Sequence, residues 1–402
     1  MRSNSNVRIC LVSTIGYPNR SRLGGVPNCT RSLALALANE GHEVSVITGR
    51  REDGPFQEND GPVTVYGLPL GNLHYYVVRV GLGFCMWPRV LKSIEWGSGV
   101  GSFVNTLHSK GKLDVAVYSN VWIDALRHPK HIPYAVRIDT PISSIRDAPG
   151  CGDQSGWGAF EFLERRATRK ANAIICLTDS TAKEIRSEYK IAEDKTIVIP
   201  NPVDTDCFRP RQREGAHCPR IFHAGPRLND WQKGSHILLE AMEQVIVAFP
   251  EAELFLAGSN PPSLEKQSEP LRRAIRVLGW LDSDSLAEQY AMADVTIVPS
   301  LSHEAFSLVC AESLASGTPV IGSSVGGIPD VVRHMETGLI VPPGDSRALG
   351  EAIVRILSDV PLLTRMRQRA RQTAERDYSL ESVGKKMSAL CDRLVREHAH
   401  SD

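Results

Sequence analysis

The chain has 402 residues, which is too long for one ordinary hydrophobic core and suits two α/β domains. Hydrophobic residues make up 42% and charged residues 23%, so extensive disorder is excluded. Basic and acidic residues are equal in number, 46 of each, which argues against a nucleic-acid-binding protein.

The chain begins with a polar stretch, MRSNSN, that leads directly into the first predicted strand. It contains no apolar signal-peptide core, and no run reaches the roughly 18 apolar residues that a spanning helix needs. Nine cysteines are scattered without a Cys-x-x-Cys pair, which favours free thiols in a reducing compartment. We therefore predict a cytoplasmic protein without an integral membrane segment, and leave peripheral membrane attachment open.

The first predicted domain, residues 1–202, alternates strands with helices. A glycine-rich loop over 21–27 is followed by a helix predicted over 28–39, with Asn28 as its N-cap. The predicted strands cover residues 7–13, 43–48, 114–118, 134–138, 173–177 and 196–199. Strands rich in β-branched residues and separated by helices indicate a parallel sheet covered on both faces.

One aromatic segment of this domain, residues 73–96, has two interpretations. It carries three basic residues, as an interfacial membrane helix would, but glycines and a proline interrupt it. We expect it to lie in the core or to line an acceptor pocket.

Residues 200–219 contain four prolines and then a polar run, which indicates a domain boundary. The second predicted domain, residues 203–377, has a helix over 235–249 and strands over 221–224, 253–257, 277–278, 295–298, 320–322 and 339–341. The fold class is therefore α/β, with two doubly wound Rossmann-like domains facing each other across a cleft. Ligands of such sheets bind beyond the carboxyl ends of the strands.

The most informative stretch is residues 299–332. A predicted strand ends at Pro299, Glu304 lies on the following loop, and a helix begins near Ser307 and carries Glu312. A helix N-terminus is a ready diphosphate site because its first N–H groups are unpaired, and here these belong to Phe306, Ser307 and Leu308. Glu312 could accept hydrogen bonds from a ribose and Glu304 from a transferred sugar. Spacing alone does not separate this interpretation from two ordinary surface carboxylates.

This stretch resembles the motif of glycosyltransferase family 4, a retaining family of GT-B fold. Glu304 and Glu312 fit the family's Glu-x7-Glu pair. The residues after them fit its Ala-x-Gly-x-Pro-Val run and its Gly-Gly turn with a following acidic residue: Ala315, Gly317, Pro319, Val320, Gly326, Gly327, Pro329 and Asp330. The family more often has Glu where Asp330 stands.

Other matches follow in the family's order. Residues 199–208 resemble its interdomain segment, and residues 225–234 resemble a loop whose Arg and Lys bind the donor diphosphate. Lys233 fits well, whereas Arg227 fits more loosely because Pro226 precedes it and the loop is long. Two such cations can neutralise the charge on a departing nucleoside diphosphate, although solvated surface cations are the ordinary alternative. Gly24 and Gly25 match the N-terminal Gly-Gly loop, where backbone can approach the donor.

Three further residues are ambiguous. Asp139 stands about where many family members have a His near the reacting sugar; it could hold the sugar or acceptor, or be a turn residue, and Arg137 competes with it. Gly279 and Trp280 stand where the family's loop contacts the nucleotide base. A turn glycine and a core tryptophan would explain them nearly as well.

No metal site or cofactor is predicted. Asp282 and Asp284 have the Asp-x-Asp form of a metal motif, but they directly precede a helical run, so capping is the simpler explanation. The resemblance agrees, because GT-B enzymes generally need no bound metal.

The resemblance implies a metal-independent hexosyltransferase that retains the configuration of the sugar. Its donor would be a nucleotide-sugar, with a UDP-sugar favoured, and its acceptor a hydroxyl of a glycan, a glycolipid or an aminocyclitol-like small molecule. Front-face displacement would need no carboxylate nucleophile. A nucleotide-sugar epimerase, a phosphorylase and a non-catalytic sugar-nucleotide-binding protein on the same fold are the alternatives. The apolar spacing over 378–398 predicts a last helix, which the resemblance returns to the first domain.

Overall fold

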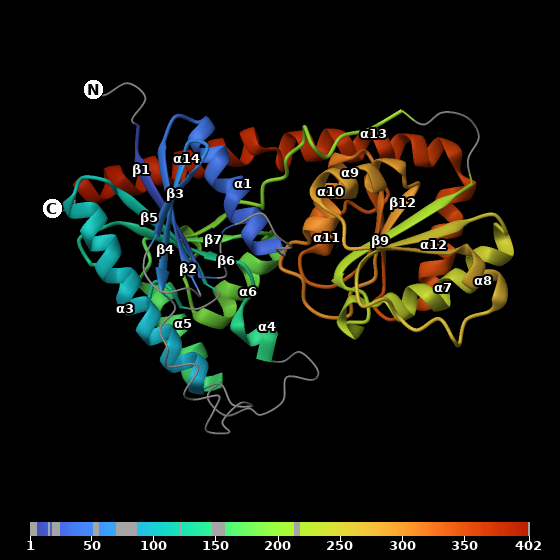
Figure 1. Cartoon of the computed structure of the whole chain (residues 1–402), viewed down its shortest axis with the longest axis horizontal. Helices are drawn as coiled ribbons and strands as arrows, with labels where there is room; N and C mark the ends of the chain where they lie inside the picture. Colours follow the sequence, from blue (N-terminus) through green and yellow to red (C-terminus); the bar gives the residue numbers. More distant parts are fainter. Residues whose placement is uncertain are drawn as a thin grey trace. The chain divides into compact units, whose positions relative to one another are not determined.

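The structure is a computed structural model that describes residues 6–14, 17, 25–50, 56–69, 87–120, 123–146, 157–212 and 218–400. The chain divides into two compact units (Figure 1): one comprises Met1–Pro202 and Val383–Asp402, the other Val203–Ser382. Among the described helices, none has the length and apolar content that crossing a bilayer requires.

The first unit contains an eight-stranded sheet in the order β3-β4-β2-β1-β5-β6-β7-β8. Every neighbouring pair is parallel except β3 and β4, which form an antiparallel hairpin at the edge. This hairpin was not predicted, because β3 is mostly polar and exposed. The strands are β1 (Arg8–Ser13), β2 (Glu43–Arg50), β3 (Phe56–Asp60), β4 (Val63–Pro69), β5 (Val115–Ser119), β6 (Tyr134–Ile138), β7 (Ala173–Cys176) and β8 (Thr196–Val198).

Helices cover both faces of this sheet, and alternate strand residues face each layer. Ile9 and Leu11 of β1 pack against α1 and α14, whereas Cys10 and Val12 belong to the cluster formed with α3, α5 and α6. The helices are α1 (Gly25–Asn39), α3 (Trp87–Ser109), α4 (Ile142–Arg146), α5 (Trp157–Lys170), α6 (Asp179–Tyr189) and α14 (Leu380–Ala399). The predicted start of α1 was wrong: Asn28 is exposed inside the helix and is not its N-cap.

Helix α3 covers the end of the ambiguous aromatic segment; residues 73–86 of that segment lie outside the described residues. Val90 and Trp96 are buried in the core, so the described part of the segment is core. The glycines of α3 are the reason why this helix was not predicted from the sequence. At Gly101 a Cβ atom would lie 2.3 Å from the Arg127 carbonyl oxygen, so glycine allows a close approach there.

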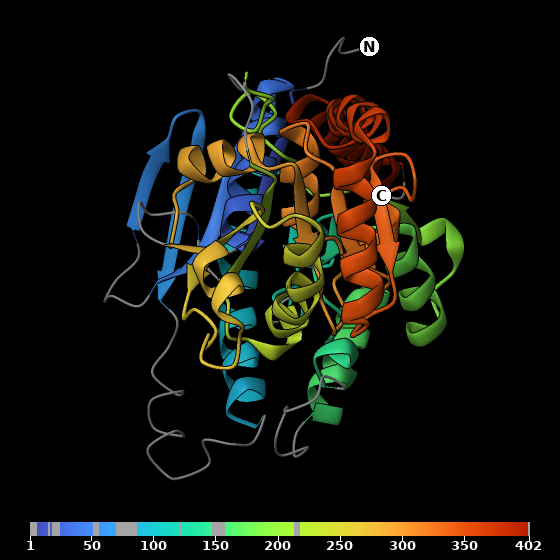
Figure 2. The same ribbon diagram turned by 90° about the vertical axis from the view of Figure 1, so that its right-hand side faces the viewer.

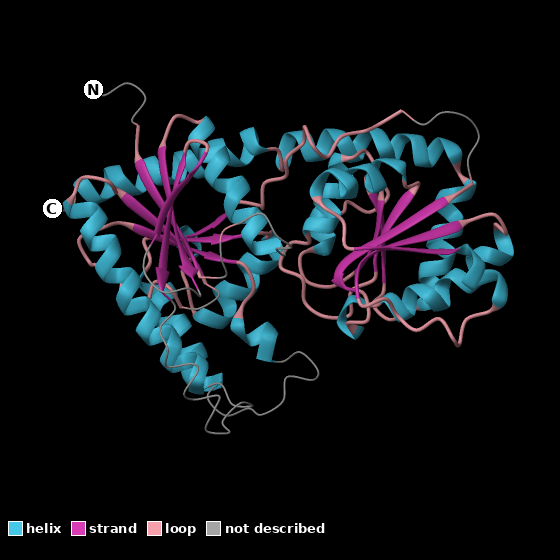
Figure 3. Ribbon diagram, viewed as in Figure 1, coloured by secondary structure: helices cyan, strands magenta, loops and turns pink. Residues whose placement is uncertain are grey.

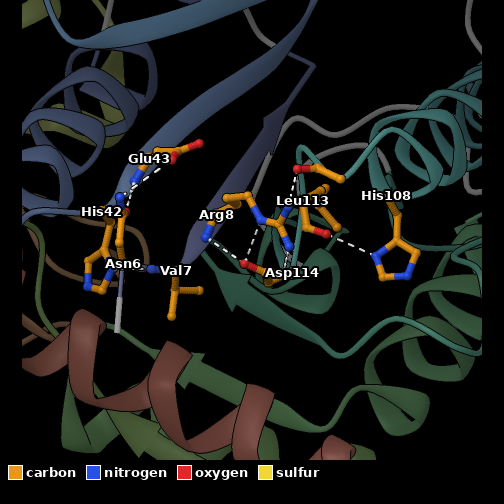
Figure 4. A network of polar contacts seen from close by, with 9 residues as sticks. Asn6, Val7, Arg8, His42, Glu43, His108, Leu113 and Asp114 are labelled. Atoms are coloured by element: carbon orange, nitrogen blue, oxygen red, sulfur yellow. Dashed lines mark hydrogen bonds and ion pairs between the residues drawn. The ribbon is translucent and has the colours of Figure 1, made fainter. Parts of the chain in front are cut away.

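Polar contacts tie the amino-terminal end of β1 to its neighbours (Figure 4). The Arg8 backbone N–H and Nε both donate to Asp114 Oδ2 at 2.9 Å. The Val7 N–H donates to His42 Nδ1 at 3.2 Å, and His42 Nε2 lies 2.7 Å from Ser388 Oγ of α14. Structural contacts therefore hold the amino-terminal ends of the strands, whereas ligands of such sheets bind at the opposite, carboxyl ends.

The second unit has a six-stranded, fully parallel sheet in the order β11-β10-β9-β12-β13-β14. The strands are β9 (Arg220–Arg227), β10 (Glu253–Ser259), β11 (Ile275–Gly279), β12 (Val295–Val298), β13 (Val320–Ser323) and β14 (Gly338–Val341).

Helices lie on both sides of this sheet as well. Figure 1 places α9, α10 and α13 on one side and α7, α8 and α12 on the other, and Figure 3 shows the same layers by element type. In Figure 2, where this unit faces the viewer, α7 and α12 run side by side. The helices are α7 (Ser235–Ala248), α8 (Glu269–Ala274), α9 (Ser283–Met292), α10 (Leu308–Ala315), α11 (Ile328–Val331), α12 (Ser346–Ser358) and α13 (Val360–Asp377).

Candidate active site

The strand order of the second unit defines where a ligand can enter. From β9 the chain builds the sheet in one direction through β10 and β11, and from β12 in the other direction through β13 and β14. The loops that leave the carboxyl ends of β9 and β12 therefore diverge, and such a switch point is the usual ligand site of a doubly wound sheet. These two loops carry Lys233 and Glu304.

The loop that follows β9 is shaped for close contact with the end of β12. Asp230 caps a short 3₁₀ turn, η2 (Trp231–Lys233), by accepting a hydrogen bond from the Gln232 N–H at 3.1 Å. Gly234 then adopts φ +71°, and a Cβ atom there would lie 1.9 Å from the Pro299 carbonyl oxygen. Only glycine fits, so the sequence Lys233-Gly234 places the lysine beside the residues that follow β12.

A second glycine holds the Glu304 loop from the other side. The Gly327 N–H donates to the Glu304 carbonyl oxygen at 2.6 Å. Gly326 has φ +51°, and a Cβ atom at that position would come within 2.3 Å of the same oxygen. The Gly-Gly turn after β13 therefore sets the backbone that presents Glu304.

Lys233 and Glu304 form an ion pair, with 2.5 Å between Nζ and Oε1. Ser300 Oγ donates to the same Oε1 at 3.0 Å. The lysine side chain is 33% exposed and the glutamate 19%, so the pair is partly open to a ligand. Burial acts to lower the pKa of Lys233, but the Glu304 carboxylate outweighs it and the pKa is raised. The site therefore holds a fixed ammonium ion beside a carboxylate.

Helix α10 begins directly after this loop. Its N-cap, Ser307, has φ +71° and makes no side-chain capping hydrogen bond. A left-handed serine costs energy, and such strain tends to occur at functional sites. Phe306 is buried, whereas Ser307 and Leu308 are partly exposed. The first N–H groups of a helix lack intrahelical partners and favour an anion. The start of α10 is therefore a second source of positive potential for an anionic ligand, beside Lys233.

Glu312 lies on α10 and accepts a hydrogen bond from the Tyr290 hydroxyl, with 3.2 Å between the oxygens. Burial raises the pKa of Glu312 to about 7, against the smaller lowering effect of Tyr290. Tyr290 of α9 is fully buried and packs edge-on against Phe222, 5.1 Å between ring centroids. Tyr290 therefore positions one oxygen of the Glu312 carboxyl group, whose pKa lies near neutrality.

Arg227 lies at the end of β9, and Gly279 and Trp280 lie at the end of β11. Arg227 ends β9 instead of lying in a loop; its side chain is 67% exposed and lies 3.7 Å from Asp230. Gly279 ends the edge strand β11 with φ +72°. Trp280 is 39% exposed, so it is a surface residue and the core interpretation was wrong.

In the first unit, Asp139 and Arg137 form one buried ion pair at the end of β6. Arg137 Nε donates to Asp139 Oδ1 at 2.9 Å, and Ser119 Oγ donates to Oδ2 at 2.6 Å. The sequence presented these two residues as competitors, whereas here each satisfies the other. Gly25 begins α1 and so belongs to the helix, not to a loop; Gly24 lies outside the described residues.

Two buried carboxylates of the first unit carry no sequence motif and were not predicted. Asp124 accepts hydrogen bonds from Thr14 and Trp96, and burial raises its pKa to about 7. Burial likewise raises the pKa of Glu164, a hydrogen-bond partner of Asn120, to about 7. Only tertiary burial distinguishes them from ordinary acidic residues.

The Asp-x-Asp pair has a structural role. Asp282 caps α9 by accepting a hydrogen bond from the Ser285 N–H at 2.9 Å, which confirms the capping interpretation. Within the described ranges, no three His, Cys, Asp or Glu side chains come together in a way that could hold a metal ion.

Comparison with known proteins agrees with this architecture. Residues 23–207 match the family described as Glycosyltransferase Family 4, and residues 218–359 match the one described as Glycosyl transferases group 1. The chain belongs to glycosyltransferase family 4.

Individual proteins are similar along almost the whole chain. The MMP alpha-(1->4)-mannosyltransferase of Mycolicibacterium hassiacum is 29% identical, covering 97% of this chain and 98% of its own. Sucrose-phosphate synthase from Thermosynechococcus elongatus matches with a TM-score of 0.77 and 24% identity, covering 97% and 99%. Anabaena HepE in complex with UDP-glucose matches with a TM-score of 0.66 and 16% identity, covering 96% and 99%. The two structures establish the GT-B fold.

Proposed function

We propose that this protein is a retaining, metal-independent glycosyltransferase that moves a hexosyl or N-acetylhexosaminyl group from a UDP-sugar to an acceptor hydroxyl. The second unit binds the donor and the first unit the acceptor. The acceptor is a hydroxyl of a glycan, a glycolipid or a small natural product such as an aminocyclitol. Membership of the family supplies the reaction class; the residues below supply the assignment of roles.

The observation that carries the proposal is the ion pair of Lys233 and Glu304 beside the start of α10. A nucleoside diphosphate leaving group gains negative charge as its bond to the sugar breaks. Lys233 and the first N–H groups of α10 are cationic and dipolar groups that can stabilise this charge. Among the described residues, both hydrogen bonds to the Glu304 carboxylate end at Oε1. Oε2 can therefore accept a hydroxyl of the transferred sugar.

The remaining donor contacts follow from position. Glu312, one turn into α10, is assigned to the ribose hydroxyls, because a carboxylate can accept from two neighbouring hydroxyls. Trp280 offers an exposed aromatic side chain to a nucleotide base, and Arg227 offers a second, exposed cation to the diphosphate. The UDP-glucose complex of the similarly folded HepE supports uracil as the base.

The direct experiment is a donor and product assay. The protein is incubated with UDP-glucose, UDP-N-acetylglucosamine and GDP-mannose, each with a panel of saccharide, lipid and polyol acceptors, and nucleotide release is measured. Proton NMR of the product gives the anomeric configuration, which should be the same as in the donor. An epimerase would instead convert the donor without acceptor, and a binding protein would be stabilised by UDP without turnover.

Removal of divalent metal should leave most of the transfer activity. Lysine, arginine and helix N–H groups provide the positive charge that a metal ion would otherwise supply. The check is the initial rate after treatment with excess EDTA, compared with untreated enzyme. A loss that Mg²⁺ or Mn²⁺ restores would overturn this expectation and direct attention back to Asp282 and Asp284.

UDP should bind more tightly as the pH rises through about 7. With its raised pKa, Glu312 is partly protonated near neutrality, and the anion is the better acceptor for ribose hydroxyls. Affinity should rise by up to about tenfold per pH unit below that pKa and level off above it. Calorimetric titration of UDP between about pH 6 and pH 8 measures this.

Two variants separate Glu312 from the phosphate itself, whose own pKa is about 6. Glu312→Gln should keep only the phosphate part of the pH dependence. Tyr290→Phe removes a hydrogen bond that lowers the Glu312 pKa, so its midpoint should move to higher pH. A wild-type profile in Glu312→Gln would show that another group binds the ribose.

A further inference from the structure

Helix α10 has only two turns, so its position depends on what holds its ends. At its C-terminal end lies the Arg371 side chain of α13. Arg371 Nη1 is 2.7 Å from the Ala315 carbonyl oxygen, which belongs to the last residue of α10. Cations at this end of a helix satisfy free carbonyl groups and interact favourably with the helix dipole.

The same guanidinium group also holds the chain segment that enters the second unit. Arg371 Nη1 lies 3.0 Å from the Thr205 carbonyl oxygen and 2.9 Å from that of Phe208, and Nε donates to Glu375 at 2.7 Å. Three carbonyl groups from two separate segments thus converge on one nitrogen. Arg371 joins α10, α13 and the entry segment at a single point.

A glycine allows the entry segment to lie against this end of α10. Gly317 has φ +73°, and a Cβ atom there would come within 2.9 Å of Pro210 Cγ. This contact between Gly317 and Pro210 does not involve Arg371, and it likewise packs the entry segment against the C-terminal end of α10.

Two short routes lead from Arg371 to Glu312. Along α10, Ala315 is one turn away from Glu312, so a shift of the helix end displaces the carboxylate. Through the entry segment, the Phe208 ring lies 6.0 Å from the Tyr290 ring, and the Tyr290 hydroxyl donates to Glu312. Both routes act on the group assigned to the ribose.

We propose that Arg371 is a positioning residue for donor binding: it holds α10 and its carboxylate Glu312 in the arrangement that receives the nucleotide. This inference rests on the proposed function for the identity of UDP as the ligand and for the assignment of Glu312 to its ribose. Arg371 itself touches no substrate in this scheme and acts through α10 and the entry segment.

The test compares Arg371→Ala with Arg369→Ala in the full-length protein. Arg369 lies on the same helix, is exposed, and bonds only weakly to Gln372, at 3.5 Å. Arg371→Ala should weaken UDP binding about tenfold, as expected for hydrogen bonds to a charged group, and Arg369→Ala less than about twofold. Hydrogen exchange of residues 308–315 without UDP should become faster only in Arg371→Ala.

Chemical rescue distinguishes positioning from general loss of structure. Methylguanidinium at tens of millimolar should restore UDP binding to Arg371→Ala, should leave Arg369→Ala unchanged, and Arg371→Lys should be intermediate. Unchanged UDP affinity and unchanged exchange in Arg371→Ala would overturn the inference, as would a loss that methylguanidinium does not repair. Failure of the unaltered protein to bind UDP is a separate result: it rejects the proposed donor before any variant is made.

Discussion

Lys233→Ala is expected to lower kcat for sugar transfer by about 10²- to 10³-fold at saturating donor, the usual loss for removing a group that stabilises transition-state charge. Donor affinity should fall much less, because the diphosphate carries less charge in the ground state than when the glycosidic bond breaks. The lysine Nζ is held 2.5 Å from Glu304 Oε1 beside the start of α10, whereas Arg227, the other cation assigned to the diphosphate, has a 67% exposed side chain at the end of β9.

The measurement is steady-state release of UDP in the presence of acceptor, with UDP affinity determined separately. Lys266→Ala is the matched control, since Lys266 is an exposed lysine of the same unit. Glu312→Ala should show the opposite pattern, with weaker UDP binding and a smaller effect on kcat, because ribose is contacted equally in both states. Unchanged turnover of Lys233→Ala at saturating donor would place the diphosphate elsewhere.

Much of the fold could be predicted because buried parallel strands appear in the sequence as short, apolar, β-branched runs. Short β-branched runs such as β6 and β12 were predicted with the observed bounds, and the other parallel strands of the second unit to within three residues at either end. The prediction of the first unit was less complete, for physical reasons. Helix α3 contains three glycines, which lower its helix propensity and of which close packing explains Gly101, and β3 is a polar edge strand.

The candidate site could be predicted as a set of residues but not as an arrangement. Lys233 and Glu304 are 71 positions apart, and only the switch point of the sheet brings them together. The sequence showed Gly234 next to Lys233 and Gly326 in the later Gly-Gly turn. It did not show that Gly234 packs against Pro299 and Gly326 against Glu304. The pairing of Arg137 with Asp139 and the support of Glu312 by Tyr290 likewise depend on tertiary packing. The catalytic and donor-binding roles stay predictions.

The last helix supports a further prediction, because α14 follows the second unit in sequence but packs in the first. Val383, Met387, Leu390, Cys391 and Leu394 are buried with Leu33 and Leu37 of α1. Gly384 lies so close to α1 that a Cβ atom would be 2.9 Å from the Ala36 carbonyl oxygen. His42 and Ser388 add the polar contact described above.

A chain ending at Asp377 should therefore lose hydrogen-exchange protection in the first unit, although residues 1–202 are unchanged. Each buried apolar side chain contributes about 1.5–3 kcal/mol, so the five together approach the whole stability of an ordinary domain, about 5–15 kcal/mol. The largest loss is expected in β1, β2 and α1, which α14 covers. Full protection throughout residues 1–200 in the shortened chain would show that α14 does not stabilise this unit.

A point variant keeps the prediction testable if the shortened chain fails to fold. Met387→Ala should lower the free energy of unfolding of the first unit by about 2–5 kcal/mol, the range for large-to-alanine changes at buried sites. Lys386→Ala, on the exposed face of the same helix, should change it by less than about 0.5 kcal/mol. Because Met387 is buried in the core of the first unit, the loss of protection should appear in β1, β2 and α1. The protection of β9 and β12 in the second unit should stay unchanged. Equal losses in both units would mean that the helix stabilises the protein as a whole instead of covering one sheet.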